Sequence, residues 1–187
     1  LMEGNGHVCY PFDLNKVDEI EELFKKIVAE SGKLDGFVHC AGLGAVKPLA
    51  ATTYDFMQEM MRVNVLSFIE IARVMTKKKN CNSNASIVAI SSMSSIRGDK
   101  AKTAYSATKG ALDSAILAMA MELGETKKIR VNTVNPAWIK TDMYYKYIEV
   151  CGKEKIDEID QRQFLGVSTP QEIANVIAFL LSPAASQ

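Results

Sequence analysis

The chain has 187 residues, 48% of them hydrophobic, and its 22 basic residues balance 22 acidic residues to a formal net charge of zero. This length and apolar content predict one globular domain over residues 1–187 and argue against a disordered or fibrous chain. The charge balance gives no sign of nucleic acid or an anionic membrane as a partner.

Cysteine use and the lack of a targeting signal favour a cytoplasmic protein. The four cysteines have no CxxC spacing, and three lie in or beside apolar runs, where a reduced thiol behaves as a small hydrophobe. No apolar run is long enough to span a membrane, and residues 1–6 lack the regions of a signal peptide. Because the chain starts on Leu1 rather than Met, we expect upstream residues to be missing. The cysteines are Cys9, Cys40, Cys81 and Cys151.

In the first half of the chain, short apolar runs alternate with segments of helical periodicity. Residues 7–12 predict a strand, and residues 17–30 repeat apolar side chains at the spacing of an amphipathic helix. A buried strand over residues 37–40 leads into a tight loop over residues 41–44. Residues 54–79 predict a long helix whose three final lysines complement the helix dipole.

The same alternation continues to the end of the chain. Apolar runs bounded by turn residues predict strands, and apolar residues three and four apart predict helices. In chain order we expect a turn at 80–84, a strand at 85–91, a loop at 92–102, a helix at 103–127, a strand at 129–134, a mixed stretch at 141–164 and a helix from 169 to about 181.

Three threonines are candidate helix caps. Thr53 and Thr103 precede or begin predicted helices, and a threonine hydroxyl there can accept a hydrogen bond from an unpaired main-chain N–H. Thr169, Pro170 and Glu172 together have the pattern of a capping box with proline at the first helical position.

The predicted strands are apolar throughout rather than at every second residue. This pattern is typical of a parallel sheet that helices cover on both faces, so we predict an α/β fold. In such sheets ligands bind beyond the carboxyl ends of the strands. The loops after Cys40, Ser91 and Asn135 should therefore border one site.

Tyr105 and Lys109 stand four residues apart in a predicted helix, so their side chains leave the same face. An ammonium beside a phenol favours the phenolate and would lower the pKa of Tyr105 from about 10 toward neutrality. An ordinary surface pair is the alternative. Ser92, at the end of an apolar strand, supports catalysis because its hydroxyl could bind a substrate carbonyl, although a loop cap is the simpler role.

An ordered set of motifs resembles those of the short-chain dehydrogenase/reductase family, in particular 3-oxoacyl-acyl-carrier-protein reductase. The run I-V-A-I-S-S ends at Ser92, Y-S-A-T-K occupies residues 105–109, V-N-V contains Asn64, and N-P-A-W-I-K-T occupies residues 135–141. The likeness covers nearly the whole chain. It implies a three-layer Rossmann-like sheet and an NAD(P)-dependent oxidoreductase that interconverts a ketone and a secondary alcohol.

The resemblance implies four catalytic residues. Tyr105 would be the general acid and base, and Ser92 would orient and polarise the carbonyl. Lys109 would lower the pKa of Tyr105 and hold the nicotinamide ribose, while Asn64 would position a water in the proton path.

The cofactor implied by the resemblance is NAD(P)(H), with NAD versus NADP left open. The substrate would be a small carbonyl or alcohol, an acyl-carrier-linked ketone in one version, with a role in fatty acid biosynthesis. The family's two long helices pair across subunits, which implies a homodimer or homotetramer, and we expect no metal site. The implied cofactor-binding residues are Asp13, Leu14, Ala41, Gly42, Tyr105, Lys109, Pro136, Ile139 and Thr141.

Several departures from the family's pattern qualify this interpretation. The glycine-rich turn that approaches the pyrophosphate and the final strand have no counterpart, so we expect an incomplete domain that binds no dinucleotide at micromolar concentration. His39 and Cys40 replace an asparagine pair, and we expect a structural role for His39. Ala137 replaces a glycine in the N-P-G motif.

Two further questions stay open at this point. Trp138, Tyr144, Tyr145 and Tyr147 follow the cofactor loop and could line a pocket or serve as packing and subunit contacts. The alternative to an enzyme is a non-catalytic Rossmann-like scaffold or redox sensor that has lost its cofactor turn. An epimerase or dehydratase of the extended branch would need a C-terminal substrate domain.

Overall fold

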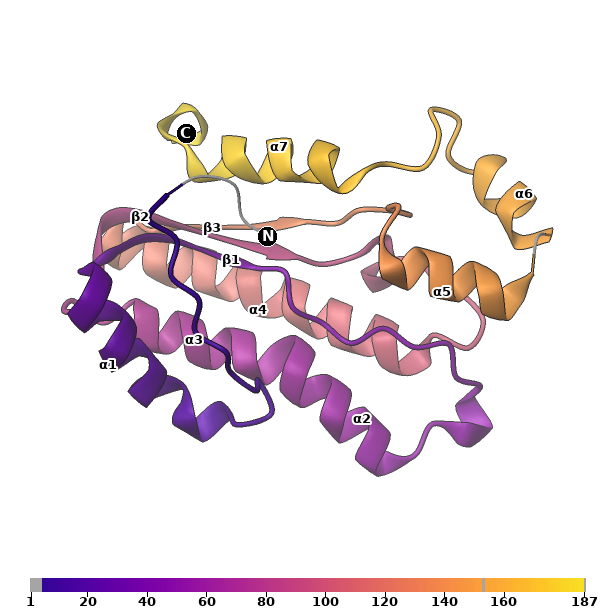
Figure 1. Cartoon of the computed structure of the whole chain (residues 1–187), viewed down its shortest axis with the longest axis horizontal. Coiled ribbons are helices and arrows are strands. Elements are labelled where there is room, and N and C mark those ends of the chain that lie inside the picture. Colours follow the sequence, from indigo (N-terminus) through magenta and orange to yellow (C-terminus); the bar gives the residue numbers. More distant parts are fainter. Residues whose placement is uncertain (1–4, 153, 187) are drawn as a thin grey trace.

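The computed structural model describes residues 5–152 and 154–186 of the chain. At its centre lies a three-stranded parallel sheet in the order β1–β2–β3. Helix α7 covers one face of this sheet, and α1, α3 and α4 cover the other (Figure 1). This layering confirms the predicted α/β fold. The strands are β1 (Leu34–His39), β2 (Cys81–Ile90) and β3 (Arg130–Val134).

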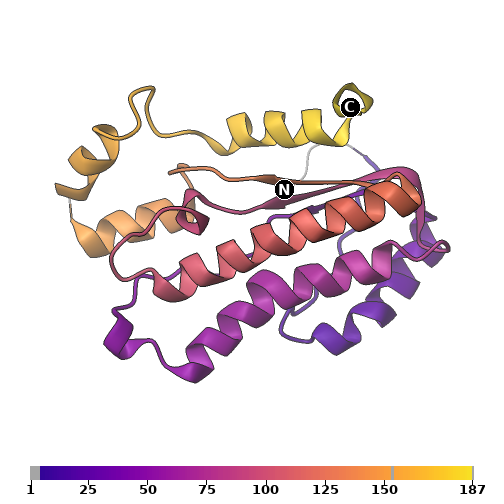
Figure 2. The same cartoon turned by 180° about the vertical axis from the view of Figure 1, so that it is seen from behind.

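The helices connect the strands in the alternating order that the sequence predicts. Figure 2 shows α4 beneath the sheet with α2 and α3 beside it. None of the described helices combines the length and apolar character needed to cross a membrane. The α-helices are α1 (Ile20–Ser31), α2 (Tyr54–Met61), α3 (Ser67–Met75), α4 (Thr103–Lys127), α5 (Asp142–Cys151), α6 (Glu154–Asp160) and α7 (Pro170–Leu181).

The central strand β2 aligns the ends of its two neighbours. His39 lies opposite Ala89, and Ile90 lies opposite Val134, so all three strands end at the same edge of the sheet. The middle of β2 is fully buried, as expected for a strand covered on both faces. The chain segments that follow the three strands therefore start side by side.

A continuous apolar core holds α4 against the sheet. Leu112 and Ile116 of α4 are buried against Ile87 of β2, and Phe68 of α3 lies in the same cluster. Burying a side chain of this size contributes about 1.5–3 kcal/mol relative to leaving it exposed. The core thus fixes the helix that carries Tyr105 relative to the strand that leads to Ser92.

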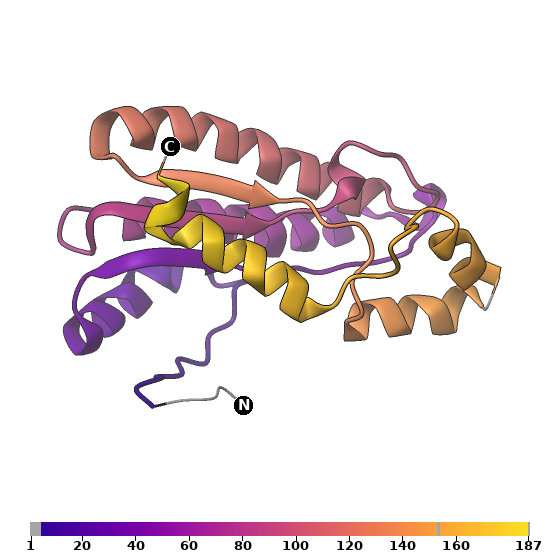
Figure 3. The same ribbon diagram turned by 90° about the horizontal axis from the view of Figure 1, so that it is seen from above.

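Residues 7–12 do not form the predicted strand. They run as an irregular segment on the β1 side of the sheet (Figure 3). A strand needs a neighbour for its backbone hydrogen bonds, and within residues 5–152 and 154–186 β1 pairs with β2 alone. The Tyr10 hydroxyl donates a hydrogen bond of 2.6 Å to Glu30 of α1, and Phe12 and Leu14 pack against the core at the end of the segment.

The helix caps agree with prediction at two of three positions. The Thr53 hydroxyl accepts a hydrogen bond from a first-turn N–H of α2, and Thr169 and Glu172 form the reciprocal capping box of α7. At α4 the N-cap is Lys102, whose side chain makes no capping bond, so the prediction for Thr103 is wrong. Thr103 instead occupies the first helical position.

The predicted helix over residues 54–79 is interrupted and shorter. A π-helical turn, Arg62–Leu66, separates α2 from α3, and α3 ends at Met75. The predicted turn at 80–84 is also wrong because β2 already begins at Cys81, with Asn84 at a φ of 63°. The positive φ at Asn84 marks a local irregularity in the strand. The turn-forming residues at this place in the sequence therefore correspond to an irregular part of β2 and not to a turn before it.

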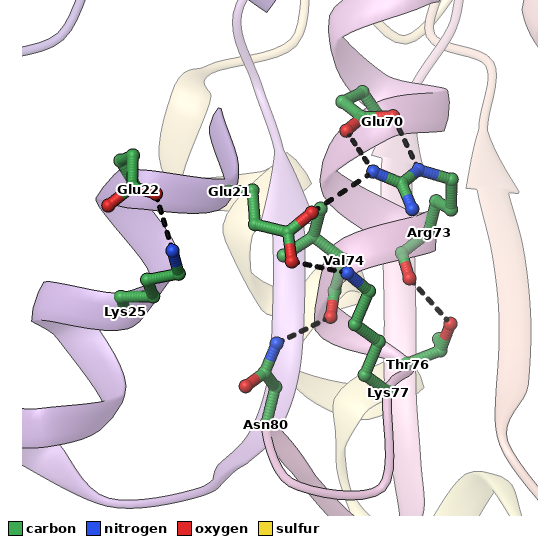
Figure 4. Close-up of polar contacts among 9 residues, drawn as sticks. All are labelled: Glu21, Glu22, Lys25, Glu70, Arg73, Val74, Thr76, Lys77 and Asn80. Carbon is green, nitrogen blue, oxygen red and sulfur yellow. Dashed lines mark hydrogen bonds and ion pairs between the residues drawn. The ribbon is translucent and has the colours of Figure 1, made fainter. Parts of the chain in front are cut away.

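Ion pairs attach α1 to α3 and to the segment after it. Glu21 of α1 lies 2.5 Å from Lys77 Nζ and 3.5 Å from Arg73, whose guanidinium also pairs with Glu70 (Figure 4). Asn80 donates a hydrogen bond of 2.7 Å to the carbonyl of Val74 at the end of α3. The two ion pairs of Glu21 give α1 a polar connection in addition to its apolar face.

Candidate active site

A cavity of about 960 Å³ opens at the edge where the three strands end. Its walls include Gly42 from the segment after β1, Ser92 from the segment after β2, and Asn135 from the segment after β3. The expectation that these three loops border one site is therefore confirmed. A volume of this size lies at the upper end of the usual range for small-molecule sites, about 300–1,000 Å³.

Ser92 lines the cavity at the start of a 3₁₀ turn, Met93–Ser95. Its Oγ accepts a hydrogen bond of 3.1 Å from the main-chain N–H of Ser94. Since the oxygen accepts in this contact, the hydroxyl hydrogen can still be donated to another group. The local turn thus orients the Ser92 hydroxyl while leaving it able to bind a carbonyl oxygen.

Lys109 lies on the cavity wall although its side chain is buried. Its Nζ donates a hydrogen bond of 2.8 Å to the carbonyl of Ile90, at the carboxyl end of β2. Burial lowers the pKa of Lys109 to about 8, while electrostatic interactions with the Asp113 carboxylate and with the Cys40 thiol group act in the opposite direction. The ammonium is therefore retained at neutral pH and lost more easily than that of an ordinary lysine.

Tyr105 also lines the cavity, and its pKa differs from the expectation. Burial raises the pKa of the phenol, and an interaction with the Ser92 hydroxyl acts in the opposite direction. The prediction that Lys109 lowers this pKa is wrong for this structure, because burial outweighs the other effects on the phenol and Lys109 Nζ is bonded to the carbonyl of Ile90 instead. At neutral pH the phenol carries its proton, which is the form that a general acid needs.

Asn64 occupies the π-helical turn and is completely buried. Its Nδ2 donates to the carbonyl of Leu43 and to Thr108 Oγ1, each at 3.0 Å, and its Oδ1 accepts from the N–H of Leu43 at 2.7 Å. These contacts use both amide protons. The side chain therefore joins the loop after β1 to α4, and it does not belong to the cavity wall.

Most of the expected nicotinamide-side residues come together. Gly42, Pro136, Ile139 and Thr141 line the cavity with Tyr105 and Lys109, and Ala41 immediately precedes Gly42. A Cβ atom at Gly42 would lie 3.6 Å from Lys109 Nζ, so glycine keeps open the space beside the ammonium. The residues present thus fit the nicotinamide end of a dinucleotide.

Asp13 and Leu14 are not brought to this cavity. Asp13 Oδ1 accepts hydrogen bonds from the main chain and side chain of Asn15, and these bonds lower the pKa of its carboxyl group. Leu14 packs against the hydrophobic core instead. Both residues follow the segment over 7–12 that does not join the sheet, which explains why they stand apart from the strand ends.

Aromatic side chains after the third strand form part of the wall. Trp138, Tyr144 and Tyr147 line the cavity, with the Trp138 and Tyr147 ring centroids 4.5 Å apart. Tyr145 is outside the lining and is 54% exposed. Lys102 Nζ lies 4.2 Å from the centre of the Trp138 ring. Three of the four aromatic residues thus belong to the pocket.

His39 has the structural position that we expect. It is buried beside the rings of Phe37 and Phe68, at centroid distances of 5.9 and 5.3 Å. Burial lowers its pKa to about 4, and the charge of Lys109 adds to this effect. Its Nε2 has no hydrogen-bond partner among the described residues. The neighbouring Cys40 lies at the cavity, where burial raises the pKa of its thiol.

The sequence interpretation overlooked two residues that support the cavity. Gln163 accepts from the N–H of Trp138 at 2.8 Å and donates to the carbonyl of the same residue at 3.3 Å. Asp113 accepts a 2.7 Å hydrogen bond from Asn135. Its position four residues after Lys109 places it on the same face of α4, and this spacing could have identified it. No comparable local signal marks Gln163.

Comparison with known proteins supports this geometry. The chain is 33% identical over 185 residues to 7alpha-hydroxysteroid dehydrogenase of Escherichia coli (strain K12), covering 99% of this chain and 71% of the relative. It is 30% identical over 186 residues to 3-oxoacyl-[acyl-carrier-protein] reductase FabG of Thermotoga maritima, covering 98% of this chain and 74% of the relative.

Solved structures and a family model agree with these relatives. ElxO with NADP bound superimposes with a TM-score of 0.81 at 27% identity, covering 93% of this chain and 70% of the other. A short-chain type dehydrogenase/reductase from Mycobacterium ulcerans gives 0.84 at 27% identity, covering 95% and 64%. The model of the enoyl-(acyl carrier protein) reductase family matches residues 1–187. The chain therefore belongs to the short-chain dehydrogenase/reductase family of NAD(P)-dependent oxidoreductases.

Proposed function

We propose that this protein interconverts a ketone and a secondary alcohol with NAD(P)(H), using Ser92, Tyr105 and Lys109. One observation carries this proposal: the three side chains line the same cavity as Pro136, Ile139 and Thr141, the residues expected at the nicotinamide. A surface pair would not have a buried lysine and a half-buried tyrosine at the carboxyl edge of a parallel sheet.

Each side chain has a chemical task that its surroundings allow. The dinucleotide supplies the hydride when bound. The Ser92 hydroxyl donates to the substrate carbonyl oxygen and polarises it, while the protonated Tyr105 phenol delivers a proton to that oxygen as it gains charge. The Lys109 ammonium, on the same cavity wall, would hold the nicotinamide ribose beside these two hydroxyl groups. Reduction thus uses Tyr105 as an acid, and oxidation uses it as a base.

Some of the residues expected to bind the cofactor line the cavity, and others lie away from it. Gly42, Ile139 and Thr141 would hold the nicotinamide end, and Lys109 would hold its ribose. Because Asp13 and Leu14 lie away from the cavity, we expect residues 1–187 alone to bind neither NAD nor NADP at micromolar concentration. Binding of dinucleotide in a calorimetric titration at that concentration would contradict this view.

The substrate, the metabolic role and the location in the cell are also parts of this proposal. A 3-oxoacyl-carrier substrate and a role in fatty acid biosynthesis are supported by the similarity to FabG of Thermotoga maritima, while the similarity to a hydroxysteroid dehydrogenase supports a bulkier ketone. The cysteine pattern supports a cytoplasmic location.

A homodimer or homotetramer is also part of the proposal. Leu66, Leu117 and Met121 are 47%, 70% and 77% exposed on the π-helical turn and α4, the long helices expected to pair across subunits. Exposed apolar side chains of this kind are typical of protein interfaces. Light scattering should give a mass at least twice that of one chain, and a monomeric mass would refute this assignment.

The decisive experiment is Tyr105→Phe in the full protein that contains this chain. The change removes one hydroxyl group and should abolish ketone reduction with either nicotinamide, while the dissociation constant for the dinucleotide stays within about twofold. If the variant keeps its turnover, Tyr105 is not the acid. If the parent protein binds dinucleotide but reduces no ketone, the alternative of a non-catalytic scaffold or sensor is correct.

A further inference from the structure

Asp113 lies one turn beyond Lys109 on α4, at the edge of a set of hydrogen bonds that is centred on Asn135 and that the proposed reaction does not use. Its Oδ2 accepts a 2.7 Å hydrogen bond from Asn135 Nδ2, and the same Nδ2 donates to Ser95 Oγ at 3.2 Å. Thr133 Oγ1 donates to Asn135 Oδ1 at 2.6 Å. The amide of Asn135 is thereby fixed from both ends.

This amide joins two segments of the cavity wall, residues 91–95 and residues 134–136. The first segment carries Ser92, and the second begins the loop expected at the nicotinamide. Both side-chain and main-chain hydrogen bonds join these two segments, so the residues on either side of Ser92 are held in place. The main-chain bonds run from Ser91 N to the carbonyl of Val134 at 2.8 Å and from Met93 N to the carbonyl of Pro136 at 3.0 Å.

The second oxygen of the same carboxylate has a different environment. Asp113 Oδ1 is buried and accepts no hydrogen bond from the described part of the chain. An unpaired buried oxygen of a carboxylate is costly unless a nearby positive charge compensates for it. Lys109, four residues earlier on the same helix, supplies that charge, and the two groups interact electrostatically.

Asp113 is the negative charge among the groups facing Lys109. Cys40 approaches the lysine from the end of β1, and burial raises the pKa of its thiol, so it is neutral at neutral pH. His39 on β1 is also neutral, with a pKa of about 4. The Tyr105 ring lies on the same helix, 5.8 Å from Nζ, and its phenol is protonated.

We propose that Asp113 is a positioning residue with two tasks: it fastens the Ser92 segment to the nicotinamide loop through Asn135, and its charge keeps Lys109 an ammonium. This inference rests on the proposed function, because it gives Asp113 a role through Ser92 and Lys109. It goes beyond the family motifs, none of which includes Asp113.

The charge task can be tested without a cofactor. Asp113→Asn removes the charge while keeping an oxygen that can accept from Asn135, and Glu122→Gln makes the same change at an exposed site on α4. The probe is competitive labelling of lysine amines with a small acylating reagent across pH, with Lys109 followed by mass spectrometry. We expect the labelling midpoint of Lys109 to fall below that of the parent in Asp113→Asn and to stay unchanged in Glu122→Gln.

The fastening task is tested by hydrogen exchange at Ser91 and Met93. Asp113→Ala removes the acceptor for Asn135 and should speed exchange at both amides by about fivefold or more, the factor that corresponds to losing one hydrogen bond. Asp113→Asn should speed it much less. If Asp113→Ala does not fold by circular dichroism, the same comparison is made with Asn135→Ala, which breaks the link from its other side.

Kinetics of the full protein then separate positioning from stability. Asp113→Ala should lower kcat by about tenfold or more, because a displacement of about 1 Å can cost up to about 100-fold. In Asp113→Asn the loss of activity at high pH should begin at a lower pH than in the parent. An unchanged Lys109 midpoint in Asp113→Asn, or unchanged exchange in Asp113→Ala, overturns the corresponding task. Both readouts stand even if Tyr105→Phe were to refute the proposed reaction.

Discussion

Two regions of this molecule are expected at one cofactor, and they are held in different ways. The segment around Ser92, Tyr105 and Lys109 lies between buried strands and helices, and main-chain and side-chain bonds fasten it. The segment that carries Asp13 is exposed and irregular and touches the core only at its end. Residues at the sheet edge are therefore held in place by packing between segments that are distant in the sequence. A short motif alone does not provide this packing.

The largest expected contrast concerns packing. Phe68→Ala should lower the free energy of unfolding by about 3–5 kcal/mol because it empties a fully buried site against Phe37 and His39. Val8→Ala, in the irregular N-terminal segment where the side chain is 53% exposed, should change it by less than about 0.5 kcal/mol. Urea denaturation of both variants measures the difference, and equal losses would refute the contrast.

The next contrast is a dependence on pH that arises at His39. Its pKa is lowered to about 4, so the unfolded chain binds the extra proton first as the pH falls below about 6.5. Stability should therefore fall between pH 6.5 and pH 4, by up to about 3 kcal/mol in total from this residue. His39→Leu removes the titrating group and should flatten this part of the curve, as measured by denaturant unfolding at several pH values. If the unfolding free energy of the variant falls with pH as steeply as that of the parent, His39 is not the cause of the pH dependence.

A smaller contrast compares two asparagines. Asn64→Ala removes three hydrogen bonds, one buried and two partly buried, and should cost about 2–3 kcal/mol, because the groups of Leu43 and Thr108 lose their partner. Asn15→Ala removes only an exposed bond to Asp13 and should cost less than about 0.5 kcal/mol. Thermal unfolding measures both changes. Similar values for the two variants would show that burial does not decide the strength of these bonds.

The same contrast explains which parts of the fold could be predicted. The helix α7 and the strands β2 and β3 follow from local signals, namely a capping box and continuous apolar runs. The strand over residues 7–12 was wrong because a strand depends on a neighbour that local sequence does not reveal. The start of β2 was predicted too late because its first residues resemble a turn when they are considered alone.

The candidate site was predictable where residues share a motif and less so where distant segments meet. Ser92, Tyr105 and Lys109 come together as the motif spacing implies. The direction of the Tyr105 pKa shift could not be predicted because it depends on burial, which outweighs the opposing interaction with the Ser92 hydroxyl. The link from Asp113 to Asn135 joins residues 22 positions apart, so only the folded structure shows it.

The π-helical turn at Arg62–Leu66 limits the insertions and deletions that this helix can accept. A π-helical turn corresponds to one residue added to an α-helix, and it advances the following turn by about 100°. Deleting one residue from this turn would restore a regular helix and rotate Asn64 away from Leu43 and Thr108. An insertion or deletion within this turn would therefore break the hydrogen bonds of Asn64, so the length of the turn is tied to those contacts.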